Sequence, residues 1–230
     1  MIENPPILTI RKEAHRPTAA QITAFRDVPT GFVADAMNGV GALSGITPLC
    51  TDGSLPRSMS GPALTVHAGP GDVLATLAGL GSIRASDIMV IAFAAYQGCA
   101  AAGDRVMGMI ANNGGVGLVT DGPMRDYDGI VEAGLPVWCS GLTPNSPQTT
   151  GPGAVGLPVQ IGGRTVDTGD MIVADRDGVV VVPFEQLDDV IARLPDIHEL
   201  ETALDTRVAD GLTMPDHIRD LLASDKVRSM

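Results

Sequence analysis

The chain has 230 residues, a formal charge of −12, 44% hydrophobic residues and only 3% aromatic residues. This length suits one domain with a sizeable core, and the acidic charge disfavours nucleic acid and anionic membranes as partners, because phosphate binding depends on clustered Lys and Arg. Lys12 and Lys226 are the only lysines. Schiff-base enzymes, pyridoxal phosphate enzymes and Walker-type phosphate loops therefore lack their required amine in the body of the chain.

The sequence shows no apolar run near the ~20 residues of a membrane-spanning helix, and no charged-then-apolar leader follows Met1. Its three cysteines, Cys50, Cys99 and Cys139, are few and odd in number, which favours reduced thiols over a disulfide framework. We therefore expect a soluble protein of the cytoplasm.

In chain order, residues 1–17 carry three prolines and mixed charge, which predicts an extended arm. The arm could be a loose terminus or could pack on a neighbouring subunit. Thr18 is a candidate cap for a short helix, and Thr30 begins a second one. On this second helix, capping or pairing across an interface is the favoured role of Asp35, and direct catalysis is the alternative.

The next elements alternate between strand and helix. Residues 61–67 predict a strand ending at His67, which we interpret as a structural side chain, with a substrate contact as the alternative. Asp72 follows a Gly-Pro-Gly turn and can cap a helix through about Leu80. The apolar run from Ile88 to Ala95 predicts a buried strand.

A connection rich in glycine and alanine, residues 96–103, follows this strand. Its small residues let the backbone approach a ligand, and the helix that begins after it offers N–H groups to an anion. Cys99 lies in this connection without a matching histidine pattern, so we interpret it as a small buried residue.

The stretch from Gly103 to Asp126 is the most informative part of the chain. It reads as loop, helix, buried strand and sharp turn, which predicts that Asp104 at the start of the helix lies close to Arg125 and Asp126 after the strand. Two carboxylates suit Mg²⁺ or Mn²⁺, and a guanidinium binds a carboxylate or a developing oxyanion. The alternative is a simple turn salt bridge, which contributes at most about 1 kcal/mol.

Beyond this stretch, Tyr127 to Ala133 predict a helix and residues 135–139 a strand. Residues 143–153 are rich in Thr, Pro, Gly and Ser, and they predict a loop long enough to be mobile or to lie over the site. Such a loop is a candidate for selecting the substrate.

The rest of the chain predicts two β-units and a helical tail. The units are residues 155–166 and 171–182, and we interpret the Asp-x-Asp-Gly turn of the second as a hairpin turn rather than a calcium loop. Three helices, 184–194, 196–210 and 215–223, follow. The alternation of strands and helices predicts a single-domain α/β sandwich.

At the Gly103 to Asp126 stretch, the sequence resembles the RraA-like family. The family includes the class II 4-hydroxy-4-methyl-2-oxoglutarate/4-carboxy-4-hydroxy-2-oxoadipate (pyruvate) aldolases and the regulator of ribonuclease activity A. The aldolase signature is an Asp, twenty residues and Arg-Asp, which Asp104, Arg125 and Asp126 fit. The pattern Asn-Gly-x-x-Gly-x-Val-x-Asp-Gly-x-x-Arg-Asp, from Asn113 to Asp126, makes the match more specific.

This resemblance implies a layered α/β/β/α sandwich related to swivelling β/β/α domains. The arm would cover residues 1–17 and the catalytic core residues 18–183. Residues 184–230 would form a helical tail that packs on the core or on a neighbouring subunit. The resemblance also implies a homotrimer, or a homohexamer built as a dimer of trimers, with its sites at subunit interfaces.

The resemblance further implies a metal-dependent lyase acting on a small 2-oxo acid. Asp126 would bind Mg²⁺ or Mn²⁺ directly and Asp104 would bind it through water. Gly103 and the backbone N–H groups of Arg105 and Val106 would bind the substrate carboxylate. Arg125 would bind the substrate and stabilise the enolate oxyanion that precedes pyruvate.

A glutamate from an adjacent subunit completes the water network in the aldolases. Glu201 is the candidate here, Glu199 is its competitor, and a solvated helix face is the alternative for both. A metal-polarised water or hydroxide held by Asp104 and Glu201 would take the C4 hydroxyl proton. Decarboxylation of oxaloacetate passes through the same enolate without such a base, so it could be a side activity or the main one.

Two other roles occur within the family. A protein-interaction role like that of the ribonuclease regulator is the alternative to an enzyme, and the acidic charge suits docking onto a basic partner. A methyltransferase role has little support, because a strand, glycine-rich turn and helix followed by an acidic ribose ligand is not found. Ala102, where aldolases often carry a bulky residue, predicts a wider pocket or a different substrate.

Overall fold

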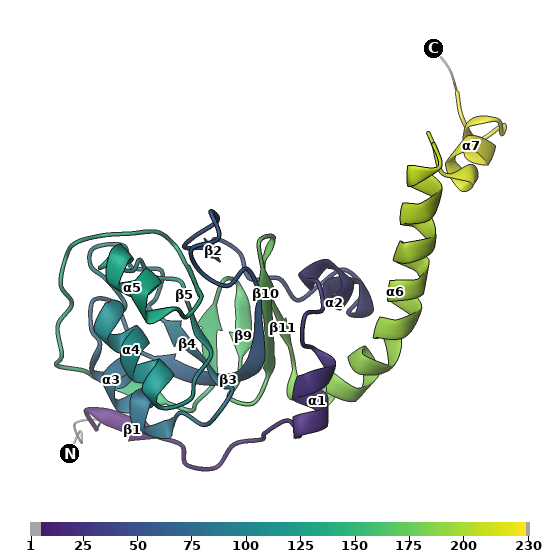
Figure 1. Cartoon of the computed structure of the whole chain (residues 1–230). Helices are drawn as coiled ribbons and strands as arrows, with labels where there is room; N and C mark the ends of the chain where they lie inside the picture. The colour runs from purple at the N-terminus through teal and green to yellow at the C-terminus, as the bar shows by residue number, and fades with distance from the viewer. Residues whose placement is uncertain (1–5, 229–230) are drawn as a thin grey trace.

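One strand belongs to two sheets in the computed structural model, which describes residues 6–228. The first half of β3 (Met59–His67) pairs antiparallel with β10 (Met171–Asp175), and its second half pairs parallel with β4 (Ile88–Ala92). Strand β10 also forms a hairpin with β11 (Gly178–Val182). The two sheets therefore share a strand and lie face to face (Figure 1).

The larger sheet has the order β1-β7-β3-β4-β5-β6-β2, with β3, β4, β5 and β6 parallel. Its other strands are β1 (Leu8–Ile10), β2 (Thr47–Pro48), β5 (Gly117–Thr120), β6 (Val137–Cys139) and β7 (Gly153–Val155). A separate hairpin consists of β8 (Val159–Ile161) and β9 (Arg164–Val166).

Helices cover the outer faces of both sheets (Figure 1). On the larger sheet lie α3 (Leu74–Gly79) with a 3₁₀ turn at Leu80–Ser82, α4 (Asp104–Asn112) and α5 (Tyr127–Ala133). On the β10–β11 side lie α1 (Ala19–Ala24), α2 (Thr30–Ala36) and α6 (Leu187–Ala209), which follows a 3₁₀ turn at Phe184–Gln186. The last helix is α7 (Asp216–Leu222).

Three hydrophobic clusters fill the three interfaces between these four layers. Along β4, Met89 and Ile91 pack toward α4 and α5, whereas Ile88 and Val90 pack toward the second sheet. Because successive side chains of a strand point to opposite faces, a strand buried on both faces is apolar throughout. This packing confirms the predicted α/β/β/α sandwich.

Several local predictions are confirmed. Thr18 caps α1 in a capping box with Gln21, and α2 begins at Thr30. Helix α5 has the predicted bounds, and Asp175 pairs with Gly178 across the predicted hairpin turn. Each of these predictions depends on capping or turn residues that lie within a few positions of the element itself.

Other local predictions are wrong. Residues 155–161 do not form one strand: β7 ends at Val155 in the larger sheet, and β8 belongs to a separate hairpin. The strand predicted to reach Ala95 ends at Ala92, because Ala94 and Ala95 have φ angles of 58° and 51° and turn the chain away.

The predicted division of the tail at residue 195 is also wrong, because α6 runs through Pro195. Proline removes one helical N–H donor and usually breaks or kinks a helix. Here Leu187, Val190 and Leu194 hold the first half of α6 in the third hydrophobic cluster. Packing on the core therefore keeps the helix continuous.

The arm of residues 1–17 does not remain apart from the sheet. Leu8–Ile10 form β1, which pairs parallel with β7 of the same chain. Neither of the two expectations for the arm included this strand. The first part of the predicted arm, residues 1–5, lies outside the described residues.

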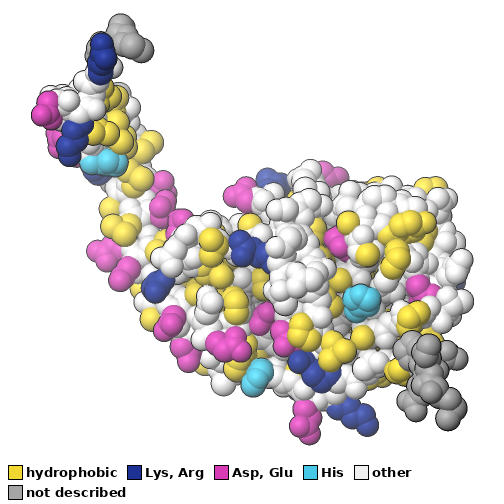
Figure 2. Space-filling model, turned by 180° about the vertical axis from the view of Figure 1, so that it is seen from behind, with side chains coloured by type: hydrophobic (Ala, Val, Ile, Leu, Met, Phe, Trp, Pro, Cys, Tyr) yellow, Lys and Arg dark blue, Asp and Glu magenta, His cyan; other side chains and the backbone are white. Residues whose placement is uncertain are grey.

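The distal half of α6 and all of α7 project away from the body of the molecule (Figures 1 and 2). Large apolar side chains are exposed along this projection: Leu200, Leu204, Val208, Leu221 and Leu222. A helix with an apolar stripe normally buries it against another element. This projection is the part of the molecule that most lacks a packing partner among the described residues.

Two further expectations concern the cysteines and membrane-spanning helices. Cys50, Cys99 and Cys139 are all free thiols. Within residues 6–228, helices long and apolar enough to cross a membrane are absent.

Candidate active site

The motif residues meet at the carboxyl ends of β4 and β5. Asp104 is the first residue of α4, which follows β4, and Asp126 immediately precedes α5, which follows β5. Ligands of parallel α/β sheets bind at this edge, where loops leave the strands. The predicted approach of Asp104 to Asp126 is therefore built into the parallel order of the strands.

Two glycines make room for the two carboxylates. A Cβ at Gly103 would lie 2.7 Å from Asp126 Oδ2, and a Cβ at Gly129 would lie 2.7 Å from Asp104 Oδ2. Each carboxylate thus lies against a glycine of the opposite helix start. Gly103 has φ −148°, which any residue adopts, so it is space rather than backbone geometry that requires glycine here.

Arg125 lies beside these carboxylates and is held at two points. Its Nε lies 3.1 Å from Asp126 Oδ2, and its Nη1 donates to Ser146 Oγ at 2.8 Å. The side chains of Arg125 and Asp126 are 34% and 44% exposed, so this ion pair contributes little to stability. The guanidinium is fixed in direction and still reachable by a ligand.

The predicted backbone donors are already engaged. The N–H of Arg105 donates to Asp104 Oδ1 at 2.6 Å, and the N–H of Val106 donates to the Gly103 carbonyl at 3.1 Å. A substrate carboxylate would have to displace these bonds. Their role in substrate binding stays a prediction.

Asp121 shapes the loop that faces the motif. Its carboxylate accepts hydrogen bonds from the N–H groups of Phe93, at 2.6 Å, and Ala95, at 2.8 Å. Positive φ angles are unfavourable for alanine, so these bonds offset part of the cost of the turn at Ala94 and Ala95. The turn directs the glycine-rich connection toward the site.

The loop between β6 and β7 lies over this edge and is tied down by Asp72. The Asp72 carboxylate accepts hydrogen bonds from Leu74 N–H, from both the N–H and the hydroxyl of Thr150, and from Gly151 N–H. Burial of Asp72 raises its pKa, but these bonds outweigh burial and hold the pKa below its ordinary value. Of the two expectations for this loop, the structure favours coverage of the site.

A polar cavity of about 580 Å³ lies under this loop. Its wall includes Gly98, Cys99, Asn145 and Ser146, and Asn145 is fixed by a 2.9 Å bond to the Gly98 carbonyl. Because Ser146 also binds Arg125, the cavity lies next to the guanidinium. Its size is within the range of small-molecule sites.

Tyr127, which follows Asp126, is an unsuitable base at neutral pH. Its hydrogen bond with the Cys50 thiol, together with the nearby Asp52 charge, raises the pKa of Tyr127 to about 12. The phenol therefore stays protonated at neutral pH, so no phenolate is available to act as a base.

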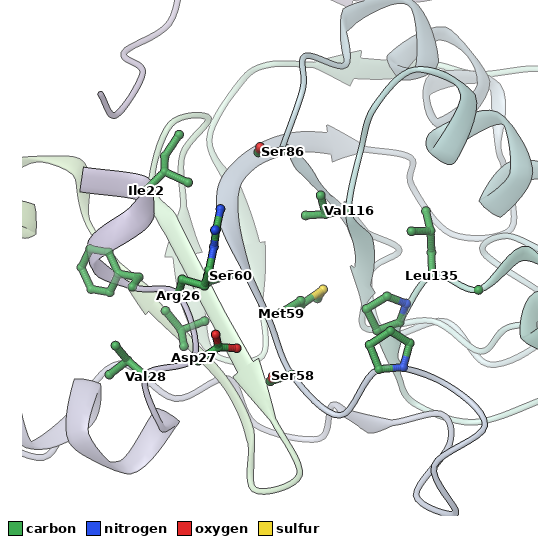
Figure 3. A pocket seen from close by; sticks show the side chains of 15 residues that line it. Ile22, Arg26, Asp27, Val28, Ser58, Met59, Ser60, Ser86, Val116 and Leu135 are labelled. Atoms are coloured by element: carbon green, nitrogen blue, oxygen red, sulfur yellow. The ribbon is translucent and has the colours of Figure 1, made fainter. Parts of the chain in front are cut away.

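A second cavity, of about 300 Å³, lies at the opposite edge of the sheet (Figure 3). Its wall combines apolar residues such as Ile22, Met59 and Leu135 with Arg26 and Asp27. Asp104, Arg125 and Asp126 do not line this cavity. The carboxylates and the guanidinium that can bind a metal and an anion lie at the carboxyl ends of β4 and β5, so we take that edge as the candidate active site.

The remaining predicted residues are dispersed. Glu201 is partly exposed and Glu199 is exposed on α6, which lies on the far side of the sandwich from α4 and α5 (Figure 1). His67 is exposed at the end of β3, and Asp35 is exposed on α2. Within one chain, Glu201 is thus not brought to Asp104 or Asp126, so its role depends on a second subunit.

Sequence reasoning missed Ser146, Asn145 and Asp121. Asp121 lies inside the motif of residues 113–126, directly after a buried strand, which could have singled it out. Ser146 and Asn145 lie in a polar loop, and their bonds to Arg125 and Gly98 join residues 21 and 47 positions apart, so no local signal marks them. Cys99 is buried, as predicted, and burial raises the pKa of its thiol.

The donor set fits a hard divalent cation. Asp104 and Asp126 offer carboxylate oxygens in a space that a Cβ at Gly103 or Gly129 would fill. Across residues 6–228, groups of three or more His, Cys, Asp or Glu placed to hold a metal do not occur. One or two carboxylates with several waters suit Mg²⁺ or Mn²⁺, whereas a structural zinc site needs more protein ligands.

The protein is thus an α/β/β/α sandwich that places Asp104, Arg125 and Asp126 together at one edge of a parallel sheet. The family model "RraA-like: Aldolase/RraA" matches residues 30–181. The chain belongs to the RraA-like family.

Its relatives carry two kinds of name. A Halalkalibacterium halodurans protein provisionally named 4-hydroxy-4-methyl-2-oxoglutarate aldolase is 34% identical over 192 residues, 83% of this chain and 90% of that protein. Streptomyces coelicolor RraAS2, an unusual member of the RNase ES inhibitor RraA protein family, superposes with a TM-score of 0.75 at 28% identity, covering 84% and 99% of the two chains. The RNA-processing inhibitor RraA from Thermus thermophilis shares the fold at 19% identity, with a TM-score of 0.62 over 68% and 93%.

Proposed function

We propose that the protein is a divalent-metal-dependent aldolase that cleaves a 4-hydroxy-2-oxo acid to pyruvate, with oxaloacetate decarboxylation as a related activity. The observation that carries the proposal is the arrangement of Asp104, Asp126 and Arg125, with each carboxylate against a glycine and the guanidinium fixed by Ser146. A turn salt bridge alone would not need these glycines.

Asp126 would bind the cation directly and Asp104 would bind it through water. When bound, the cation would act as a Lewis acid toward the keto and carboxylate oxygens of the substrate. Either Mg²⁺ or Mn²⁺ suits this oxygen donor set.

Residues of the chain would direct the transfer of the C4 hydroxyl proton and stabilise the negative charge of the enolate. Asp104 Oδ2, which the Arg105 N–H does not bind, would direct a water toward the C4 hydroxyl. As this water takes the hydroxyl proton, the C3–C4 bond breaks, its electrons enter the enolate, and a carbonyl product leaves. Arg125 would stabilise the enolate oxyanion until C3 is protonated to give pyruvate.

The projecting helix supports a site shared between subunits. At helical spacing, Glu201 is four residues after Ile197 and three before Leu204, so it lies on the same face as Ile197, Leu204 and Val208. Glu199 lies off this face. If a second copy covers the apolar stripe, Glu201 is carried into the interface and Glu199 is not. We propose a homotrimer or a dimer of trimers in the cytoplasm on this basis and on the family resemblance.

The proposal is tested by measuring pyruvate release from 4-hydroxy-4-methyl-2-oxoglutarate and from oxaloacetate, with Mg²⁺ or Mn²⁺ and with a chelator. We expect metal-dependent turnover that falls by roughly 10²–10³-fold in Arg125→Ala. Asp126→Ala should abolish the response to metal. Asp128→Asn, on the same helix start and exposed, is the matched control and should retain activity.

The likeness to the RNase ES inhibitor family favours a second candidate, a protein-binding regulator. A folded, metal-supplied protein without turnover on either substrate would refute the aldolase. Inhibition of a ribonuclease by that same preparation, unchanged in Arg125→Ala, would support the regulator.

A further inference from the structure

A cavity of about 460 Å³ lies at the sheet edge opposite the candidate active site, between the N-terminal arm and the residues that precede β4. Its wall includes four cationic side chains, Arg11, Lys12, Arg16 and Arg84. These are four of the fifteen Lys and Arg residues of a chain whose formal charge is −12. Such a concentration of positive charge in an acidic protein calls for a physical explanation.

The arm is fixed at both ends, so its basic residues have defined positions. Strand β1 pairs with β7, and the N–H of Arg11 continues this pairing by donating to the Val155 carbonyl at 3.0 Å. At the other end, Thr18 begins α1 with its capping box. His15 stacks on Phe184 with 4.8 Å between ring centroids, which holds the middle of the segment.

Two of the four cations are paired with carboxylates of the protein, and one of them keeps an unused donor. Arg11 pairs with Asp167, and Arg16 pairs with Asp87 at 2.5 Å and donates to the Ala85 carbonyl at 2.7 Å. The Nε of Arg11 is buried without a hydrogen-bond partner among the described residues. A buried guanidinium N–H of this kind normally finds an acceptor.

The other two cations have free ends. The side chains of Lys12 and Arg84 are exposed and form no hydrogen bond or ion pair within residues 6–228. Among the lining residues Asp87 is the carboxylate that faces these cations, and Asp167 lies beside the cavity as the partner of Arg11. The buried carboxylate of Asp170 lies behind Asp167 and accepts hydrogen bonds from the N–H groups of Asp167 and Phe184. Lys12 and Arg84 therefore leave unpaired positive charge at the cavity wall, which suits an anion.

We propose that this cavity binds the phosphate group of a small molecule. A phosphate presents three acceptor oxygens and close to two negative charges at neutral pH, which suits several guanidinium donors better than a single carboxylate does. Ser82 also lines the cavity and adds a hydroxyl donor. The volume exceeds that of phosphate alone, so it leaves space for the rest of the molecule.

This site is independent of the proposed aldolase chemistry. The cavity lies before the amino end of β4, at Gly81 to Asp87, whereas Asp104 and Asp126 lie beyond the carboxyl ends of β4 and β5. Binding here can therefore be measured without substrate or metal.

Isothermal titration calorimetry with inorganic phosphate tests the proposal, with malonate as the carboxylate probe at equal ionic strength. Arg84→Gln and Lys12→Gln are the test variants, and Arg57→Gln is the control, because Arg57 is exposed and lines a different surface. Circular dichroism and thermal melting verify that all variants fold.

We expect the wild type to bind phosphate more tightly than malonate, and each test variant to weaken phosphate binding by roughly tenfold or more. Arg57→Gln should leave the affinity unchanged. Absence of phosphate binding by the wild type would overturn the proposal. An equal loss in Arg57→Gln, or malonate binding as tight as phosphate binding, would overturn it as well.

Discussion

Gly103→Ala is the most direct test of how the site is built, because it adds one methyl group and removes no functional group. The new Cβ would lie 2.7 Å from Asp126 Oδ2 and 3.0 Å from Arg125 Cγ. An ordinary contact requires about 3.4 Å, so the carboxylate must move by about 0.7 Å. The substitution therefore displaces both motif residues that follow β5.

The expected effect is large on activity and small on stability. A misplacement of about 1 Å at a reacting centre can lower the rate by roughly 10²-fold, so a shift of this size predicts a loss of about 10–100-fold in kcat/KM. Overpacking usually costs about 1–3 kcal/mol in a core. Because Arg125 and Asp126 are partly exposed and can move outward, we expect the lower end of that range.

The assay is pyruvate release under saturating Mg²⁺ or Mn²⁺, together with thermal unfolding. Gly108→Ala is the matched control, because Gly108 lies on the same helix and a Cβ there meets no atom within 4 Å. Alanine at that position should raise helix stability by roughly 0.5–1 kcal/mol and leave kcat/KM unchanged. Wild-type kcat/KM in a folded Gly103→Ala protein would show that the close approach of Asp126 has no role in the reaction.

Three further changes test the surroundings of the site. Asp72→Asn should lower the free energy of unfolding by roughly 1–3 kcal/mol, since the carboxylate serves four donors. Because the folded-state pKa of Asp72 is lowered, this difference should be complete above about pH 4 and shrink as the pH falls below it, in denaturant titrations at several pH values; a pH-independent difference would contradict the assignment. Ser146→Ala should lower kcat/KM by roughly 2–10-fold at unchanged Tm, because Arg125 loses one hydrogen bond; an unaltered kcat/KM would mean that the guanidinium needs no such support. Pro195→Ala should raise Tm, because alanine restores a helical N–H donor; a lower Tm would show that proline itself is required at this position.

The sequence specified the parts of this molecule that depend on neighbouring residues. The capping box at Thr18, the bounds of α5 and the Asp175 hairpin turn all follow from local chemistry. The approach of Asp104 to Asp126 was also predictable, because consecutive parallel strands deliver their following loops to one edge.

What escaped prediction depends on contacts between distant residues. The N-terminal arm offers no turn or periodicity that indicates its pairing with β7, and α6 continues through Pro195 because of the core beneath it. Likewise, the hydrogen bond from Arg125 to Ser146 joins two loops that α5 and β6 separate along the chain. Local propensity is a weak guide wherever tertiary packing decides the outcome.

The strand shared by the two sheets has a consequence for how the chain acquires its structure. The first half of β3 has its partner, β10, near the end of the core, so this half stays unpaired until β10 is available. Pairings between residues far apart in sequence are slow to form, because they close long loops. Emerging from the ribosome, the chain would therefore expose an unpaired strand edge until residues 171–182 have been synthesised. Pulse-labelling hydrogen exchange should show amides of Met59 to Gly61 becoming protected together with those of β10, and later than those of β4.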